Sequence, residues 1–372
     1  MGRPAVGINL LWLVPGEVGG SEESTLASVR ALGTAAPDLD LRLFVLEPLV
    51  AAHPDLAERF GVDVLRSSGR ARWRRVVAES TWLRRRTRGL DLVHHAGGTA
   101  PLRRGGPYVL TVHDLQPLER RGTHGAVKRA WLRATIPPSV RHARCTVVPS
   151  EFVRRTVLDH IAVEPDRVVA IPHGVEPPGV ATGLDELTDR YRLDGPVVLY
   201  PAITYPHKNH RVLVAAFARL VARHPGALLV LTGGEGSEEP ALRAQVESLG
   251  LTDRVRRTGR ISAADVAGLY QAAAVVAVPS RYEGFGLPAA EAMAHGAAVV
   301  AADTTALPEV VGDAGVLVGP DDVGGWATAI GSLLDDAGER ARLGALGRAR
   351  SVARHSWAAN AAALADVYRS ET

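Results

Sequence analysis

Residues 274–303, AVVAVPSRYEGFGLPAAEAMAHGAAVVAAD, decide the fold of the region around them. The stretch begins and ends in short apolar runs, AVVAVPS (274–280) and AAVVAAD (297–303), and an alanine-rich segment that follows Pro288 separates them. Apolar runs of this length, joined through a helical segment, are typical of a strand–helix–strand unit in a parallel sheet. The sequence therefore predicts a parallel α/β architecture here, with a helix that begins at Pro288.

Two carboxylates flank the start of this predicted helix. Glu283 precedes the turn Gly284-Phe285-Gly286, and Glu291 follows Pro288 by three residues. Glu291 is therefore expected in the first helical turn, beside the positive end of the helix dipole. The glycines leave backbone N–H groups bare at the same helix end, which suits a phosphate. The arrangement favours a ligand with hydroxyl and phosphate groups, such as a nucleotide sugar. The alternative is an ordinary glycine turn with no ligand.

The same alternation of apolar runs and helical segments extends along the whole chain. Strand-like runs in the first half occupy residues 5–14, 41–46, 62–65, 91–95, 108–114, 145–150 and 168–175, and those in the second half occupy 196–202, 227–234, 255–259, 274–280, 297–303 and 315–320. This pattern predicts two doubly wound, Rossmann-like α/β domains that face each other across a cleft, with ligands at the carboxyl ends of the strands. The expected boundaries are residues 1–180, a linker at 181–194, residues 195–355 and a final helix at 356–372.

Composition narrows the class of protein. The 372 residues are 46% hydrophobic and 22% charged, which is ordinary for a globular protein of two or three domains. The net charge of +3 argues against a generic polyanion binder, and no nucleic-acid partner is expected. No apolar run reaches the length of a membrane-spanning helix, and the N-terminal run is interpreted as a strand rather than a signal peptide. The single cysteine, Cys145, is expected to be buried, and is compatible with a reducing cytoplasm.

Two further candidate site elements lie in the N-terminal half. The first strand runs into a turn with Gly19 and Gly20 before a helix, and such paired glycines let backbone N–H groups approach a phosphate. A tight turn without a ligand is the alternative. His113 is predicted to end the strand 108–114, where an imidazole can hydrogen-bond a sugar hydroxyl or move a proton near neutral pH. A purely structural histidine remains an equal alternative. His94 and His95 are expected to end a neighbouring strand.

Two more candidates lie in the C-terminal half. Only two of the 43 basic residues are lysines, and one of them, Lys208, follows the strand 196–202 at the start of a helix, where its compact charge suits a diphosphate. Gly233, in the turn Thr232–Gly236 after the next strand, leaves room for a nucleobase or ribose, or is simply a turn. No histidine and carboxylate cluster repeats at the spacing of metal ligands, so no metal is expected.

An arginine-rich segment, Arg70–Arg88, stands apart from these elements. It contains eight arginines and one acid, with Trp73, Trp82 and aliphatic residues interleaved. A basic amphipathic helix with tryptophans is suited to an anionic membrane surface. A solvated helix face is the main alternative, and the sequence offers no fold context for nucleic-acid recognition. The expected location is the cytoplasm, with peripheral association at the inner face of the cell membrane through this segment if the acceptor is lipid-linked.

Several motifs in order resemble family 4 retaining glycosyltransferases. Glu283 and Glu291, eight positions apart around GFGLP, resemble the E-x7-E signature of that family. The resemblance covers most of the chain, through the turn at Gly19-Gly20, LTVHDLQP with His113, VVPSEFVRR, VVAIPHGV, PHKNH with Lys208, VLTGGEG, LPEVVGDAGVLVGP and a closing SW…Y helix. It implies the GT-B architecture, in which the C-terminal helix crosses back to the first domain.

The resemblance also implies roles for these residues. Glu291 is expected to hold the donor ribose, and Glu283 to lie near the donor sugar. Lys208 and the Gly20 backbone are expected to neutralise the diphosphate. Three groups of residues complete the implied site: catalytic His113 and Glu283, donor-binding Gly19, Gly20, Lys208 and Gly233, and donor-binding Gly284, Phe285, Gly286, Leu287 and Glu291. No metal or other cofactor is implied, because protein cations and helix dipoles would neutralise the leaving group.

One departure from the family pattern concerns the diphosphate. Many members have an arginine a few residues before the lysine, and residues 201–207 contain none. His207 or Arg260 are candidates for the second cation. The expected function is retaining transfer of a hexose, with mannose as one candidate, from a nucleoside-diphosphate sugar to a hydroxyl of a glycan or lipid-linked acceptor. The alternatives are a nucleotide-sugar epimerase or hydrolase of the same fold, and a non-catalytic nucleotide-sugar or glycan-binding module.

Overall fold

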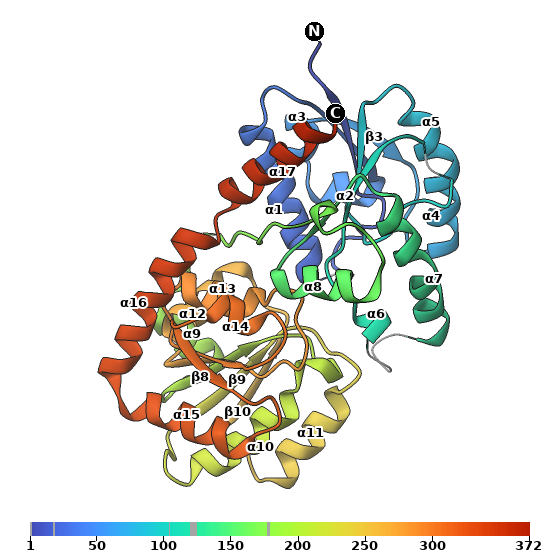
Figure 1. Cartoon of the computed structure of the whole chain (residues 1–372). Coiled ribbons are helices and arrows are strands. Elements are labelled where there is room, and N and C mark those ends of the chain that lie inside the picture. Colours follow the sequence, from blue (N-terminus) through green and yellow to red (C-terminus); the bar gives the residue numbers. More distant parts are fainter. Residues whose placement is uncertain (1, 18, 104, 120–124, 177–178) are drawn as a thin grey trace. The chain divides into compact units, whose positions relative to one another are not determined.

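The computed structural model describes residues 2–17, 19–103, 105–119, 125–176 and 179–372. The chain forms two compact units, Met1–Gly174 together with Trp357–Thr372, and Val175–Ser356. Each unit contains one parallel sheet with helices on both sides, so the predicted pair of Rossmann-like folds is confirmed (Figure 1).

The first unit contains a seven-stranded sheet in the order β3-β2-β1-β4-β5-β6-β7. Its strands are β1 (Ala5–Asn9), β2 (Asp40–Leu46), β3 (Gly61–Leu65), β4 (Leu92–His95), β5 (Tyr108–Thr111), β6 (Cys145–Val148) and β7 (Val168–Ala170). Its helices are α1 (Gly20–Ala35), α2 (Glu47–Ala52), α3 (Asp55–Arg59), α4 (Arg72–Ala78), the π-helical turn η1 (Glu79–Leu83), α5 (Arg84–Arg86), α6 (Gln116–Glu119), α7 (Ala126–His142), α8 (Glu151–His160), the 3₁₀ turn η2 (Pro165–Arg167) and α17 (Trp357–Glu371). The strand order reverses between β1 and β4, which pair in parallel. In such sheets, ligands bind at the carboxyl ends of the strands beside this reversal.

The first strand is shorter than its apolar sequence predicts. The run 5–14 was expected as one strand, but β1 ends at Asn9. The Asn9 side chain accepts a hydrogen bond from Leu11 N at 3.1 Å, and this local turn competes with the sheet ladder. The apolar residues that follow β1 are not part of the strand, but Leu10, Leu11 and Leu13 are still fully buried.

The C-terminal helix α17 belongs to the first unit, as the GT-B resemblance implies. It packs beside α1 (Figure 1), and Asn360 Nδ2 donates to Pro172 O at 2.7 Å. Tyr368 is fully buried, and its hydroxyl lies 2.6 Å from His94 Nδ1 on β4. Gly174 passes so close to this helix that an added Cβ would lie 2.4 Å from Trp357 N. The last 16 residues therefore complete the core of a domain that begins at the other end of the chain.

The second unit contains a six-stranded sheet in the order β10-β9-β8-β11-β12-β13. Its strands are β8 (Val197–Pro201), β9 (Leu228–Thr232), β10 (Val255–Gly259), β11 (Val275–Val278), β12 (Val299–Ala302) and β13 (Gly315–Val318). Its helices are α9 (Leu184–Tyr191), the 3₁₀ turn η3 (Pro206–Lys208), α10 (His210–Val221), α11 (Glu239–Ser248), α12 (Ala263–Ala272), α13 (Leu287–Ala294), α14 (Leu307–Val311), α15 (Val323–Asp335) and α16 (Ala337–Arg354). The order again reverses at one point, between β8 and β11, which pair in parallel.

The predicted linker at 181–194 is an integral part of the second unit. It contains α9, on which Leu187 is fully buried. Thr182 Oγ1 donates to Asp265 Oδ1 at 2.6 Å, and Tyr191 OH donates to Asp265 Oδ2 at 2.5 Å. The chain passes from the first unit to the second at Gly174–Val175 rather than at residue 180, because these contacts attach α9 to α12.

Two single residues of the first unit have clear local environments, and the predicted burial of Cys145 is confirmed. Ser150 is the N-cap of α8, and its hydroxyl accepts a hydrogen bond from Val153 N at 3.1 Å. Cys145 is buried in the first unit, and burial raises the pKa of its thiol to about 12. Within the described residues, no helix combines the length and the apolar character needed to cross a membrane.

Candidate active site

The strongest candidate site of the second unit lies where its strand order reverses. Lys208 follows β8 and Glu283 follows β11, so both residues leave the sheet at the carboxyl ends of neighbouring strands. Lys208 Nζ donates to Glu283 Oε1 at 2.7 Å, and both side chains are largely buried. Two residues that the sequence separates by 75 positions are therefore brought into one ion pair.

The backbone around Lys208 is held on both sides. Asn209, in the left-handed conformation, donates through Nδ2 to Pro279 O at 3.0 Å and to Pro320 O at 2.7 Å. The Tyr200 hydroxyl lies 2.8 Å from Ser280 Oγ and donates to Lys208 O at 2.9 Å. These contacts reach from β8 to the loop after β11, and they place the lysine before any ligand is bound.

The same ion pair controls the charge of Glu283. Burial by itself raises the pKa of this carboxyl, but the charge and hydrogen bond of Lys208 outweigh burial, with help from Ser280 and His207. The net effect lowers the pKa of Glu283 below its ordinary value. Glu283 is therefore a carboxylate at neutral pH, and Lys208 stabilises its negative charge.

The turn that follows Glu283 requires its last glycine. Gly286 has a φ of +106° and is the N-cap of α13, and an added Cβ would lie 2.7 Å from Leu307 Cδ2. Phe285 is buried and meets His355 edge-to-face, with ring centroids 5.4 Å apart. Gly284 and Leu287 flank these two residues and are half-buried.

The expected place of Glu291 in the first helical turn is wrong. Because α13 begins at Leu287, Glu291 is its fifth residue and lies in the second turn. The helix dipole acts mainly on groups within the first turn, so it does not account for this carboxylate. Instead, Glu291 Oε2 accepts a hydrogen bond from Tyr270 OH at 2.7 Å, which fixes the side chain from α12.

In the first unit, the structure places His113 two residues beyond the end of β5 rather than on the strand. Its Nε2 lies 3.0 Å from Ala96 O, which makes Nε2 the donor and leaves Nδ1 as an acceptor. Nδ1 is buried and has no hydrogen-bond partner within the described residues. Burial, partly offset by the bond to Ala96, lowers the pKa of His113, so its imidazole is neutral at pH 7.

A pocket of the first unit brings His113 together with residues of α1 and α17. Its lining includes Thr25, Thr111, His113, His173 and Asn360. The His113 ring lies 5.5 Å from the Trp12 ring and 6.2 Å from the His173 ring, measured between centroids. Gly20, the first residue of α1, and Gly19, its N-cap with a φ of +80°, precede the residues that line this pocket. The first turn of α1 also contains Glu22, which is buried and whose carboxylate accepts a hydrogen bond from Gly16 N.

His94 and His95 end β4 as predicted, but His94 has a structural role. Its Nδ1 lies 2.6 Å from Tyr368 OH, and its Nε2 lies 2.7 Å from Thr111 Oγ1. A neutral ring satisfies both contacts, since it has one donor and one acceptor. His94 thereby connects α17 to the two central strands β4 and β5.

The buried histidines predict a stability that depends on pH. Burial, with smaller effects of neighbouring histidines, lowers the pKa of both His94 and His173 to about 3. The unfolded chain therefore binds more protons below pH 6.5, and folding stability falls as pH falls. Between pH 7 and 5.5 we expect each histidine to remove about 1 kcal/mol from the unfolding free energy of the first unit. Urea titrations at the two pH values measure the change, and a His173→Gln variant should show a smaller one. Identical curves would contradict the expectation.

Sequence reasoning missed the residues that hold the site. Thr305 Oγ1 accepts from Glu283 N at 3.1 Å, and Arg257 binds the backbone of the loop after β9. The position of the charged Arg257 within a predicted strand is a feature of the sequence that could have indicated such a role. Thr305, Tyr200 and Ser280 have no such signal, because their roles depend on contacts across the sheet.

The fold and these turns define a class of protein. Two units, each with one parallel sheet and glycine turns at the carboxyl ends of its strands, are the components of the GT-B architecture. HepE from Anabaena, solved in complex with UDP and glucose, has a similar structure, with a TM-score of 0.78 and 19% identity over 99% of this chain and 100% of that one.

Sequence comparison shows the family. The family model described as Glycosyltransferase Family 4 matches residues 18–177, and that described as Glycosyl transferases group 1 matches residues 195–336. The D-inositol 3-phosphate glycosyltransferase of Acidothermus cellulolyticus is 33% identical over 75% of this chain and 67% of its own length. The MMP alpha-(1->4)-mannosyltransferase of Mycolicibacterium hassiacum is 34% identical over 71% of this chain and 65% of its own length. The chain belongs to glycosyltransferase family 4. It spans 52% to 67% of the length of eight curated relatives that it matches.

Proposed function

We propose that this protein transfers a hexosyl group from a nucleoside-diphosphate sugar to a hydroxyl of an acceptor, with retention of the anomeric configuration. The observation that carries the proposal is the pair formed by Lys208 and Glu283 at the strand reversal of the second unit. A buried cation at the carboxyl ends of parallel strands suits a diphosphate that gains negative charge as it leaves. The structural neighbour with bound UDP and glucose and the relatives named glycosyltransferases support this assignment.

Each candidate residue has a proposed role. Lys208 neutralises the diphosphate and Glu283 lies beside the donor sugar, with its charge set by Lys208. Glu291, held by Tyr270, accepts hydrogen bonds from the ribose hydroxyls. In the first unit, the unpartnered Nδ1 of His113 accepts a hydrogen bond from a sugar hydroxyl. Gly19 and Gly20 present backbone N–H groups at the start of α1. Catalysis would consist of positioning and charge stabilisation, without a metal.

A panel of nucleotide sugars tests this proposal. UDP, GDP and ADP sugars, with mannose and glucose donors in each set, are added in a thermal-shift assay, because a ligand that binds the native state raises its apparent stability. The donor that shifts the melting temperature is then incubated alone and with acceptors. Product only in the presence of an acceptor supports the transferase, whereas turnover of the donor alone indicates an epimerase or hydrolase. Binding without turnover indicates a binding module.

The acceptor is proposed to have an anionic group. Arg72 and Arg75 lie close enough to Lys128 for their charges to lower the pKa of its ammonium, and none of the three forms an ion pair within the described part of the chain. Burial, followed by the repulsion of Arg72, lowers the pKa of Lys128, with Asp114 acting in the opposite direction. Such cations are suited to a phosphate. Inositol phosphates and phosphorylated glycans should therefore be better acceptors than the matching neutral compounds, and equal rates would reject the idea.

The arginine-rich segment supports a proposed contact with an anionic membrane surface. Residues 72–86 form one continuous helical segment through α4, η1 and α5. Trp73 and Val77, one turn apart, are 67% and 53% exposed, and Arg74 lies over the Trp73 ring at 5.3 Å. Trp82 is instead half-buried and meets Phe44 edge-on. The exposed residues of this segment are Trp73, Arg74, Val77, Thr81, Arg84, Arg85 and Arg86. This contact would place the protein at the inner face of a cell membrane.

Liposome sedimentation measures this contact. Vesicles with anionic lipid are expected to bind the protein at low salt and to release it as the ionic strength rises. A Trp73→Ser/Val77→Ser variant removes the exposed apolar pair and should bind more weakly. A matched Leu249→Ser variant, which changes an exposed apolar residue of the second unit, should bind as the parent does. No binding of the parent protein at low salt would remove the membrane contact from the proposal.

A further inference from the structure

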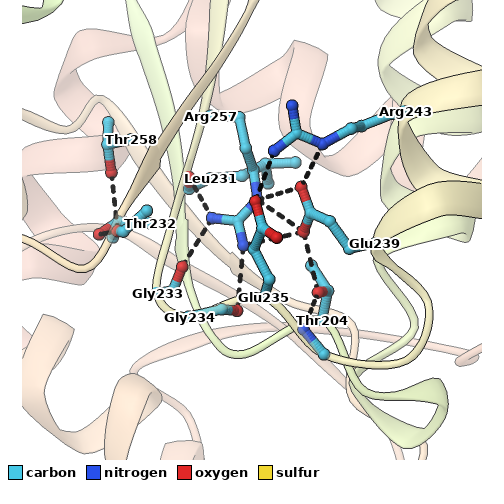
Figure 2. Close-up of polar contacts among 12 residues, drawn as sticks. Thr204, Leu231, Thr232, Gly233, Gly234, Glu235, Glu239, Arg243, Arg257 and Thr258 are labelled. Atoms are coloured by element: carbon cyan, nitrogen blue, oxygen red, sulfur yellow. Dashed lines mark hydrogen bonds and ion pairs between the residues drawn. The ribbon is translucent and has the colours of Figure 1, made fainter.

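A buried ionic network lies at the carboxyl ends of β8, β9 and β10 (Figure 2). Glu239, at the start of α11, is 4% exposed, and its carboxylate accepts from Arg257 Nε at 3.0 and 3.2 Å. Thr204, in the loop between β8 and Lys208, is fully buried and donates to Glu239 Oε2 at 2.9 Å. Arg243 adds a further contact with Glu239 at 2.9 Å. The network thus joins α11 and the loop after β8 to β10.

The remaining N–H groups of the Arg257 guanidinium donate hydrogen bonds to backbone carbonyls. Nη1 donates to Leu231 O at 3.1 Å and to Gly233 O at 2.8 Å, and Nη2 donates to Gly234 O at 3.0 Å. Figure 2 shows these bonds converging on the loop that follows β9. A lysine cannot reproduce this set, because only the planar fork of arginine reaches several fixed acceptors at once.

These bonds orient two successive peptide groups. In a trans peptide the C=O and the following N–H point in opposite directions, and the described residues include no cis peptide bond. Since the carbonyls of Gly233 and Gly234 face Arg257, the N–H groups of Gly234 and Glu235 face away from it. Neither N–H donates a hydrogen bond within the part of the chain that the structure describes. Two adjacent free N–H groups form a site for an anionic or carbonyl oxygen.

The loop has little freedom to adopt another arrangement. Gly233 has a φ of +117°, and an added Cβ would lie 2.7 Å from the Ala202 backbone. A Cβ at Gly236 would lie 2.5 Å from Thr204 O, and Gly236 N donates to Thr204 Oγ1 at 2.7 Å. The loop after β9 therefore rests directly on the loop that continues to Lys208. Anything that moves one of these loops also moves the other.

We propose that Arg257 is a positioning residue, which orients the Gly234 and Glu235 N–H groups to donate to an oxygen of the nucleoside part of the donor. This inference rests on the proposed function, because it assigns a second contact to the same nucleotide site. The ligand class is a nucleoside diphosphate, with its diphosphate at Lys208 and a base carbonyl or ribose oxygen at the loop after β9. Arg257 itself does not touch the ligand, since its donors are occupied by Glu239 and the three carbonyls.

Calorimetric titration with UDP, GDP and ADP tests the inference. For the nucleotide that the parent protein binds, Arg257→Met should raise Kd by about ten-fold or more, since two hydrogen-bond donors are misplaced. KM for the donor should rise in parallel, whereas kcat at saturating donor should stay within about three-fold because the reacting atoms are untouched. Arg257→Lys should not restore affinity.

Two further variants separate positioning from stability. Arg257→Met/Glu239→Gln removes the stranded carboxylate, and should restore the melting temperature without restoring affinity. Arg190→Met breaks a comparable pair in the same unit, with Asp265, and should leave affinity unchanged. If the parent binds a nucleotide and the folded double variant binds it equally well, the role of Arg257 is overturned. If the parent binds none of the three nucleotides, the proposed function fails as well.

Discussion

Replacing Lys208 with alanine is expected to lower kcat/KM for the donor by at least about a hundred-fold, which is typical of removing one preorganised electrostatic contact from a transition state. The lysine is the cation that the fold places at the strand reversal of the second unit, and Tyr200 and Asn209 hold the backbone on either side of it. Affinity for the nucleoside diphosphate should fall together with the rate, because Lys208 is proposed to neutralise the charge of the leaving group. Steady-state kinetics and calorimetric titration measure both effects.

The variant also leaves Glu283 without its partner, so its effect on folding has to be separated from its effect on catalysis. Without Lys208, burial alone governs the carboxyl, and the pKa of Glu283 should rise. A Lys208→Met/Glu283→Gln protein removes both charges and should regain the melting temperature while remaining inactive. Lys208→Arg keeps the charge and should retain part of the diphosphate affinity. Full activity of a folded Lys208→Ala protein would reject the assignment.

Replacing Tyr368 with alanine is expected to destabilise the first unit by about 3–5 kcal/mol, the usual cost of truncating a buried aromatic residue. The side chain is fully buried among residues of the sheet and α1, and its hydroxyl is 2.6 Å from His94 Nδ1. Removal of the Tyr368 side chain leaves a cavity, and the buried His94 imidazole loses one hydrogen-bond partner. Five of the six tryptophans belong to the first unit, so denaturant unfolding followed by tryptophan fluorescence reports mainly on that unit.

Two variants of the same helix calibrate this result. Tyr368→Phe keeps the ring and loses only the hydroxyl, so a smaller loss of about 1 kcal/mol is expected. Arg369→Ala removes an ion pair with Asp38 that is 39% and 52% exposed, and should change stability by less than about 1 kcal/mol. If Tyr368→Ala were no more damaging than Arg369→Ala, α17 would not be part of the first core.

The strands could be predicted because their signal is local. Most strands are nearly continuous apolar runs, and the thirteen strand-like runs of the sequence correspond to β1 through β13, although β10 (VRRTG) contains two arginines. There are two exceptions. In one, a side chain competes with the hydrogen bonds of the sheet, and in the other a short helix packs against the rest of its unit. Asn9 ends β1 early, and α9 occupies the predicted linker because Asp265 holds it. Neither outcome follows from the apolar pattern.

The candidate residues were predictable in kind but not in arrangement. Glycine turns after strands, one conspicuous lysine and two nearby glutamates are visible in the sequence, and the structure places Lys208 and Glu283 after neighbouring strands and Glu291 on the following helix. The ion pair of Lys208 with Glu283 and the hydrogen bond of Glu291 with Tyr270 were not predicted. The first turn of α13 also begins one residue earlier than Pro288 indicates, which moves Glu291 into the second turn.

The parallel α/β class, the division into two such domains and the turns near the candidate residues follow from sequence patterns, because periodicity, capping and glycine conformation act over a few neighbouring residues. Which side chains meet depends on contacts between distant parts of the chain. Lys208 reaches Glu283, Arg257 binds the carbonyls of the β9 loop, and Tyr368 meets His94 across 274 positions. Such contacts depend on strand order and burial, which set the charge of each group and the direction of each peptide.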